Sequence, residues 1–70
     1  MSINVQKLKG VIVEKGTTQE NVAQAIGVDR STFYRKMKNG GENFSVKEMQ
    51  LIIKFVPLSE VEAASIFFKF

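Results

Sequence analysis

The chain has 70 residues and a hydrophobic fraction of 44%, which together predict a single folded domain over residues 1–70 rather than a disordered chain. It contains neither cysteine nor histidine, which excludes a disulfide framework, a thiolate zinc site and catalysis by a histidine base. The net charge of +3 favours an acidic partner.

The apolar runs, such as residues 51–53, are far shorter than the roughly 20 residues that a membrane-spanning helix needs. Residues 1–10 lack the apolar core of a secretory signal. The absence of cysteine fits a reducing cytoplasm, and no glycine-rich phosphate loop is present. We therefore expect a cytoplasmic protein that is not an enzyme and has no cofactor, no metal and no membrane partner.

Apolar residues recur at intervals of three and four near the N-terminus, which is the spacing of one helix face. They predict a first helix from about Ile3 to Glu14, and Gly16 would end it. The residues that form this face are Val5, Leu8, Val11 and Ile12.

A second helix is expected to begin after Thr18, whose hydroxyl group can cap it. Its inner face would consist of Val22, Ala23 and Ile26. Gly27 follows where a left-handed residue commonly ends a helix, and the turn over residues 27–29 is short. So short a turn predicts that the next helix crosses the second at a large angle.

Asp29 is a suitable N-cap for a third helix from Arg30 to about Lys38, ended by the turn residues 39–41. Phe33 and Met37, four residues apart, would face the core. Residues 30–38 carry four positive charges and no negative one. The face opposite the core is therefore polar and basic, and it consists of Arg30, Ser31, Tyr34, Arg35 and Lys38.

Ser45 and Glu48 have the spacing of a capping box, and Phe44 and Met49 have that of a hydrophobic staple. They predict a fourth helix, which must end before Pro57. Its core face would consist of Met49, Ile52, Ile53 and Val56.

Ser59 and Glu62 repeat the capping-box spacing and predict a fifth helix to about Phe68. In one interpretation, Val61, Ala64 and Phe68 close the core. In the other, Ile66, Phe67 or Phe70 remains exposed and forms the contact of a two-fold dimer. The expected fold class is all-α with five short helices.

Residues 18–40 resemble the helix-turn-helix of lambda-repressor-like and Cro-like phage regulators. The resemblance implies a lambda-repressor-like DNA-binding domain with its helix-turn-helix at about residues 18–38. One departure is Lys36, which stands where the family commonly has an apolar residue, so that Met37 takes the apolar role. The matching residues are Gln19, Ala23, Gly27, Val28 and Phe33.

The resemblance also implies that the third helix lies in the major groove of double-stranded DNA. Arginine can bind guanine O6 and N7, and serine or threonine can bind either donors or acceptors. The base-reading candidates are Arg30, Ser31, Thr32, Tyr34 and Arg35. The candidates for contact with the DNA backbone are Thr18, Gln19, Lys36, Lys38, Asn39, Gly40 and Asn43.

Several of these positions also allow a role that does not involve DNA. A charged helix face is often only solvated, Thr32 can pack against Val28, and residues 39–40 can simply form a turn. The expected function is sequence-specific transcriptional regulation by a small Cro-like repressor, bound to its operator as a homodimer. The alternative is a helical protein-interaction module, of an antitoxin or anti-repressor type, that uses the aromatic C-terminal helix.

Overall fold

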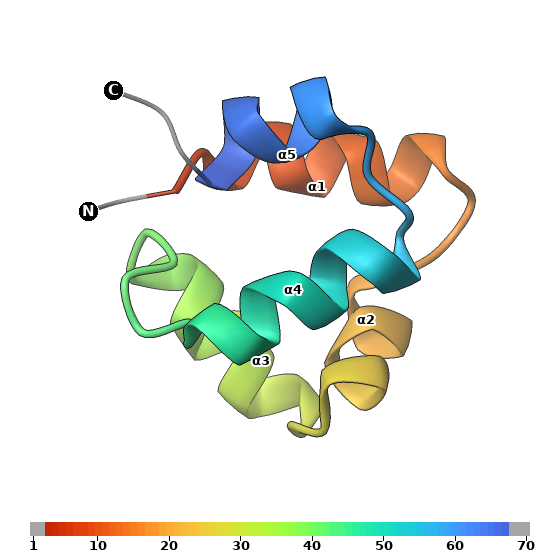
Figure 1. Ribbon diagram of the computed structural model, residues 1–70. Coiled ribbons are helices and arrows are strands. Elements are labelled where there is room, and N and C mark those ends of the chain that lie inside the picture. The colour runs from red at the N-terminus through yellow and green to blue at the C-terminus, as the bar shows by residue number, and fades with distance from the viewer. Residues whose placement is uncertain (1–2, 68–70) are drawn as a thin grey trace.

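The computed structural model describes residues 3–67, which form five α-helices (Figure 1). Over these residues there is no strand, so the predicted all-α fold class is confirmed. The helices are α1 (Val5–Glu14), α2 (Gln19–Ile26), α3 (Arg30–Lys38), α4 (Val46–Phe55) and α5 (Glu60–Phe67).

Side-chain caps begin α2 and α3 where the sequence predicts them. The Asn21 N–H donates to Thr18 Oγ1 at 3.1 Å, and the Thr32 N–H donates to Asp29 Oδ1 at 2.8 Å. Gly27 ends α2 with a φ of 83°, a left-handed conformation that glycine adopts without steric cost. These local signals fix the turn between the two helices.

Both predicted capping boxes are present. The Ser45 N–H donates to Glu48 Oε1 at 2.9 Å, and the Glu48 N–H donates back to Ser45 Oγ at 3.0 Å. Ser59 and Glu62 exchange the same pair of hydrogen bonds at 2.9 and 3.1 Å. Each box satisfies backbone donors that the helix itself leaves unpaired, so α4 and α5 begin at defined residues.

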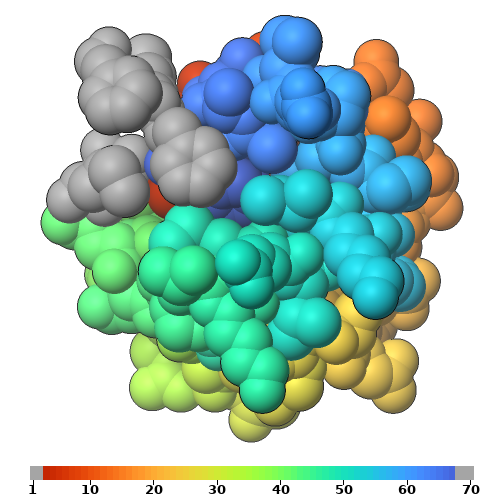
Figure 2. Space-filling model, viewed as in Figure 1, coloured from red at the N-terminus to blue at the C-terminus, as the bar shows by residue number. Residues whose placement is uncertain are grey.

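The helices form two groups (Figure 1). One group is α5 beside α1, and the other is α2 with α3 and α4 packed against it. Figure 2 shows α4 across the middle of one face, with the loop that follows α3 on one side of it and α2 on the other. The core lies between the groups and consists of Ile3, Leu8, Val11, Ile12, Val22, Ala23, Ile26, Phe33, Met37, Phe44, Ile52, Val56, Ile66 and Phe67.

α5 buries a different face from the one that we expected. Val61 is 75% exposed and Ala64 is also exposed, whereas Ala63, Ile66 and Phe67 are buried. The helix is rotated so that its two largest described apolar side chains lie inward, which removes more apolar surface from water than burying Val61 and Ala64 would.

This rotation makes the prediction of an exposed Ile66 and Phe67 wrong, because both side chains are 0% exposed within the chain. They cannot form a dimer contact while they occupy the core. Phe70, the third residue of that expectation, and Phe68, which we expected to close the core with Val61 and Ala64, lie outside the described residues.

The N-terminal segment connects the two helix groups. The Ile3 N–H donates to the Gly40 carbonyl at 3.1 Å, and the Asn4 N–H donates to the Ile66 carbonyl at 2.8 Å. The buried Ile3 side chain lies directly against Gly41, where a Cβ atom would overlap it. The segment therefore ties the loop after α3 to α5.

We expect Gly41→Ala to destabilise the protein. Its φ of 74° alone costs a residue with a Cβ atom about 1–2 kcal/mol, and overlap with Ile3 adds to that. Urea unfolding followed by circular dichroism measures the loss. Gly40→Ala has the same φ of 74° in open space and should lose less. Gly10→Ala, in the open middle of α1, should gain about 0.5–1 kcal/mol. Equal stability of the Gly40 and Gly41 variants would contradict the contact with Ile3.

Candidate nucleic-acid interface

α3 has one buried face and one exposed face. Phe33 and Met37 are 0% and 3% exposed, which confirms the prediction that they are core residues. Tyr34 is 49% exposed on the opposite face. Its exposed neighbours on α3 are polar or basic, namely Arg30, Ser31, Arg35 and Lys38.

The cap of α3 also determines what Ser31 can offer a ligand. Ser31 Oγ donates its hydrogen to Asp29 Oδ1 at 3.3 Å, so the Ser31 oxygen is left to accept a hydrogen bond. Hydrogen bonds from Thr32 lower the pKa of Asp29 below its ordinary value of 3.8, which keeps the cap ionised. Asp29 is therefore a cap rather than a ligand-contacting residue.

The two arginines of α3 have polar neighbours in the protein. Arg30 Nη1 lies 3.9 Å from Glu20 Oε2, and both side chains are more than 60% exposed. Arg35 Nη2 donates to Thr32 Oγ1 at 3.4 Å. Each guanidinium has five N–H donors, so both arginines keep donors directed to solvent. These contacts orient the arginine side chains and leave N–H donors available to a ligand.

Residues of the following loop lie next to this face. Asn39 and Asn43 are exposed, and they line a hollow in the surface together with Thr32, Arg35 and Lys36. The exposed amide groups of the loop thus adjoin the exposed side chains of α3, and together they form one polar and basic surface.

The helix-turn-helix lies within a known family. A family model described as an antitoxin Xre-like helix-turn-helix domain matches residues 12–56, which is more than half of the chain. The chain belongs to the Xre-like helix-turn-helix family. This confirms the predicted resemblance to Cro- and XRE-type proteins. No significant match was found among curated proteins or among solved structures.

The matched residues of the Xre-like domain include all of α2, α3 and α4. The family therefore supports a DNA-binding regulator or an antitoxin. Across residues 3–67, none of the helices is long and apolar enough to cross a membrane. In the same part of the chain, acidic residues form no cluster of three or more that could hold a metal ion.

In the Xre-like domain, α2 begins at Gln19 and is capped by Thr18, and both residues are polar. Thr18 Oγ1 accepts the Asn21 N–H, so its own hydroxyl hydrogen remains available to a phosphate. Gln19 is half-buried, and its Oε1 is buried without a hydrogen-bond partner. The Gln19 amide nitrogen is then the polar atom of this side chain that a ligand could contact.

Gly40 does not fit the predicted role as a phosphate contact. A phosphate needs a donor, and the Gly40 N–H already donates to the Met37 carbonyl at 3.1 Å. The Gly40 carbonyl accepts from Ile3. The Gly40 N–H therefore serves the turn that ends α3 and its carbonyl anchors the N-terminal segment, so Gly40 does not have the predicted role.

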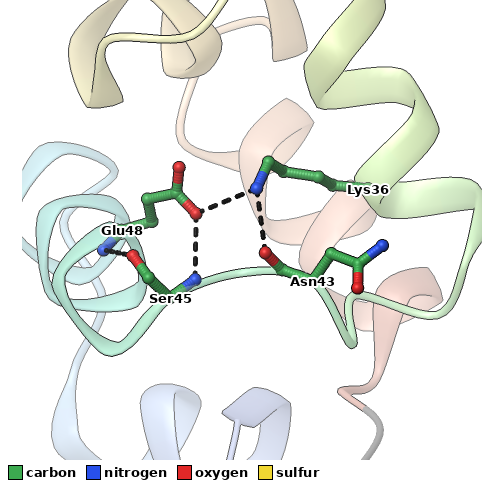
Figure 3. Close-up of polar contacts among 4 residues, drawn as sticks. All are labelled: Lys36, Asn43, Ser45 and Glu48. Atoms are coloured by element: carbon green, nitrogen blue, oxygen red, sulfur yellow. Dashed lines mark hydrogen bonds and ion pairs between the residues drawn. The ribbon is translucent and has the colours of Figure 1, made fainter.

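Lys36 also differs from its predicted role as a phosphate contact. Its side chain is only 19% exposed, and its Nζ atom lies 2.8 Å from the Asn43 carbonyl oxygen and 3.2 Å from Glu48 Oε1 (Figure 3). The Nζ atom is also 5.7 Å from the centroid of the Phe44 ring. The aliphatic stem of Lys36 thus covers apolar surface where the family commonly has an apolar residue, while its ammonium group has partners inside the protein.

Sequence reasoning did not identify Glu48 as part of this site. Its only sequence signal was the capping box, which accounts for its bonds with Ser45 but does not indicate a lysine partner twelve residues earlier. The contact between α3 and α4 becomes evident only from the three-dimensional arrangement.

Glu48 makes the stability of the Xre-like domain depend on pH. Burial disfavours its charged form, but hydrogen bonds from Ser45 and Lys36 outweigh burial, and the pKa of Glu48 lies below its ordinary value of 4.5. Because the folded state lowers this pKa, the stabilisation is complete above pH 4.5 and is lost as the pH falls through the lower, folded-state value.

We expect the urea midpoint to fall when the pH is lowered from about 7 to about 3, because Glu48 and the other carboxyl groups whose pKa the folded state lowers become protonated. The urea midpoint of Glu48→Gln should decrease less over the same pH range, because glutamine does not titrate. An acid profile of Glu48→Gln that matches the wild-type profile would show that the Lys36–Glu48 contact does not contribute.

Proposed function

We propose that this Xre-like domain binds double-stranded DNA in a sequence-specific manner and acts as a transcriptional regulator rather than as an enzyme. The observation that carries the proposal is the exposed basic face of α3, which is the second helix of the helix-turn-helix. In that motif the second helix enters the major groove. Arg30 and Arg35 have free donors for guanine O6 and N7, and Ser31 has an acceptor for an amino group of adenine or cytosine.

Backbone contacts would flank this reading face. Thr18 and Gln19 at the start of α2 supply donors on one side, and Lys38, Asn39 and Asn43 supply them on the other. Such contacts fix the orientation of the protein, while base contacts select the sequence. Tyr34 lies between the two arginines, where its ring can touch a thymine methyl group or the sugar–phosphate backbone.

The finer assignment that we propose is a small Cro-like repressor of phage origin, which acts in the bacterial cytoplasm. Two copies would bind paired half-sites about one helical turn apart and place their α3 helices in successive major grooves. Ile66 and Phe67 are buried, so the two copies would meet through another surface or only through the DNA.

Fluorescence anisotropy with duplexes from the gene's own neighbourhood tests the proposal. One duplex should bind far more tightly than its scrambled version, and log Kd should change with log salt by roughly 0.9 for each phosphate contact. Equal and weak binding to every duplex would overturn sequence-specific recognition. The stoichiometry on full and half sites tests the homodimer.

An antitoxin role is the second candidate, because the matching family is described by that word. The chain would then bind a protein as well as DNA, and the buried Ile66 and Phe67 would not supply the contact. Co-expression with the product of an adjacent gene distinguishes the roles. If the chain is an antitoxin, it should relieve growth arrest by that product, and Arg30→Ala with Arg35→Ala should abolish DNA binding but leave the relief intact.

A further inference from the structure

The loop between α3 and α4 is held by a network centred on Lys36. Lys36 Nζ donates to the backbone carbonyl of Asn43 at 2.8 Å and to Glu48 Oε1 at 3.2 Å (Figure 3). The same Glu48 oxygen accepts the Ser45 N–H at 2.9 Å. A single side chain of α3 thus fixes both the end of the loop and the start of α4.

Apolar packing secures the same segment. The Phe44 ring is buried and meets the Phe33 ring edge-on, with centroids 5.6 Å apart and planes at 60°. Asn43 is therefore held through its own carbonyl group, which accepts from Lys36, and through the buried aromatic residue that follows it in the chain. Its backbone is held, while the residue as a whole is exposed.

This held segment adjoins the reading face of α3. Asn43 and Asn39 line the same surface hollow as Thr32 and Arg35. An amide side chain at this place can donate to a phosphate next to the bases that Arg35 contacts. The amide can do so with little loss of entropy because its backbone is already fixed.

We propose that Lys36 and Glu48 are positioning residues for DNA binding, which hold Asn43 beside the reading face so that its side chain contacts the DNA backbone. Lys36 itself does not contact DNA. The proposal deepens the proposed function and rests on it.

The charges of the pair support this role over a direct phosphate contact. The Lys36 and Glu48 side chains are 19% and 17% exposed, and each neutralises the other. A neutral pair attracts a phosphate weakly and releases few counterions. A lysine that bound a phosphate would instead be free and exposed, as Lys38 is.

The chain offers a matched control at the other group of helices. Glu62 closes the capping box of α5 with Ser59, and Lys15 Nζ lies 3.4 Å from Glu62 Oε1. This pair joins α1 to α5, which lie side by side on the other side of the molecule from α3 (Figure 1). It has the same chemistry as the Lys36–Glu48 pair, but the loop that it borders lies away from the reading face of α3.

The experiment compares Lys36→Met with Glu48→Gln, made together, against Lys15→Met with Glu62→Gln. Each double variant loses one positive and one negative charge, so the net charge stays at +3. Glutamine keeps an acceptor for the capping box. Anisotropy with the preferred duplex is measured over a salt series, below the melting temperature of each variant.

We expect the Lys36–Glu48 variant to bind DNA roughly five- to tenfold more weakly, as expected for the loss of one or two hydrogen bonds, with an unchanged salt slope. The Lys15–Glu62 variant should bind as the wild type does. Equal affinity of the two variants would overturn the proposal. A salt slope reduced by roughly 0.9 in the Lys36–Glu48 variant would also overturn it, because that result identifies a direct phosphate contact.

Glu48→Gln alone tests whether DNA binding becomes tighter or weaker when the contact with Lys36 is altered. It removes a negative charge near the DNA, so simple electrostatics predicts tighter binding, whereas loss of positioning predicts weaker binding. Tighter binding would contradict the proposal.

Amide exchange in the free protein separates this inference from the proposed function. The Phe44 N–H donates to the Gly41 carbonyl at 3.2 Å within the loop, and it should exchange faster in the Lys36–Glu48 variant than in the control. If the exchange rate of the Phe44 N–H is unchanged in the variant, Lys36 and Glu48 do not hold the loop, whatever the affinity for DNA. Faster exchange in the variant, together with a wild-type protein that binds no DNA, would refute the proposed function and, with it, the role of the loop in binding.

Discussion

Phe33→Ala is expected to unfold most of the protein. Phe33 is 0% exposed and is among the largest fully buried side chains, and its ring meets the edge of Phe44. Truncating a buried phenylalanine costs about 3–5 kcal/mol. A domain of 70 residues has a total stability of roughly 4–10 kcal/mol, so this loss takes up much or all of it. Circular dichroism in a urea series measures the effect.

The neighbouring aromatic residue provides the control. Tyr34 follows Phe33 in the same helix, but it is 49% exposed on the opposite face. Tyr34→Ala should change the free energy of unfolding by no more than about 0.5 kcal/mol. If the two alanine variants unfolded at the same urea concentration, the orientation of α3 would be wrong, and with it the reading face.

Arg35→Ala is expected to weaken binding to the preferred duplex by about 1–3 kcal/mol, as expected for a lost bidentate contact with guanine. The variant should also accept any base pair at one position of the site, while it still discriminates at the others. Its fold should be unaffected, because Arg35 is exposed and the hydrogen bond that its side chain donates to Thr32 is long at 3.4 Å. Anisotropy with a set of single-base-pair substitutions measures both effects.

Lys38→Ala distinguishes base reading from general attraction. It removes the same charge from the same helix, but we expect it to weaken binding to all duplexes alike and to lower the salt slope by about 1. If Arg35→Ala behaved as Lys38→Ala does, Arg35 would contact the backbone and another residue would read the base.

Most of the fold was predictable because its signals are local. Helices α2, α3, α4 and α5 are each capped by a side chain that accepts a hydrogen bond from the backbone N–H three residues later, and a sequence shows this spacing directly. The capping residues are Thr18, Asp29, Ser45 and Ser59. The inner faces of α2 and α3 were also predicted, since apolar residues recur there at one clear helical spacing.

The face of α5 was not predictable in the same way. Apolar side chains occur all around this helix, from Val61 to Phe67, so periodicity does not select one face. The choice is made by what lies opposite, namely α1 and the N-terminal segment that binds the Ile66 carbonyl. Those contacts are distant in sequence.

The candidate site shows the same division between local and distant information. The exposed face of α3 followed from the positions of Phe33 and Met37. The role of Lys36 depends on Glu48 and on the Asn43 carbonyl, which belong to the next helix and to the loop. Sequence spacing could mark Lys36 as unusual for its position, but it could not supply its partner.

The hydrogen bonds of Ile3 and Asn4 have a consequence for how the protein folds. They join residues near the start of the described chain to Gly40 and to Ile66, and so close a loop that contains nearly all of it. The entropy of that closure is lost before these bonds form, which favours a single cooperative transition over helices that fold one by one. The family-matched segment, residues 12–56, lacks Ile3, Leu8, Ile66 and Phe67 of the core, so we expect that it does not fold on its own.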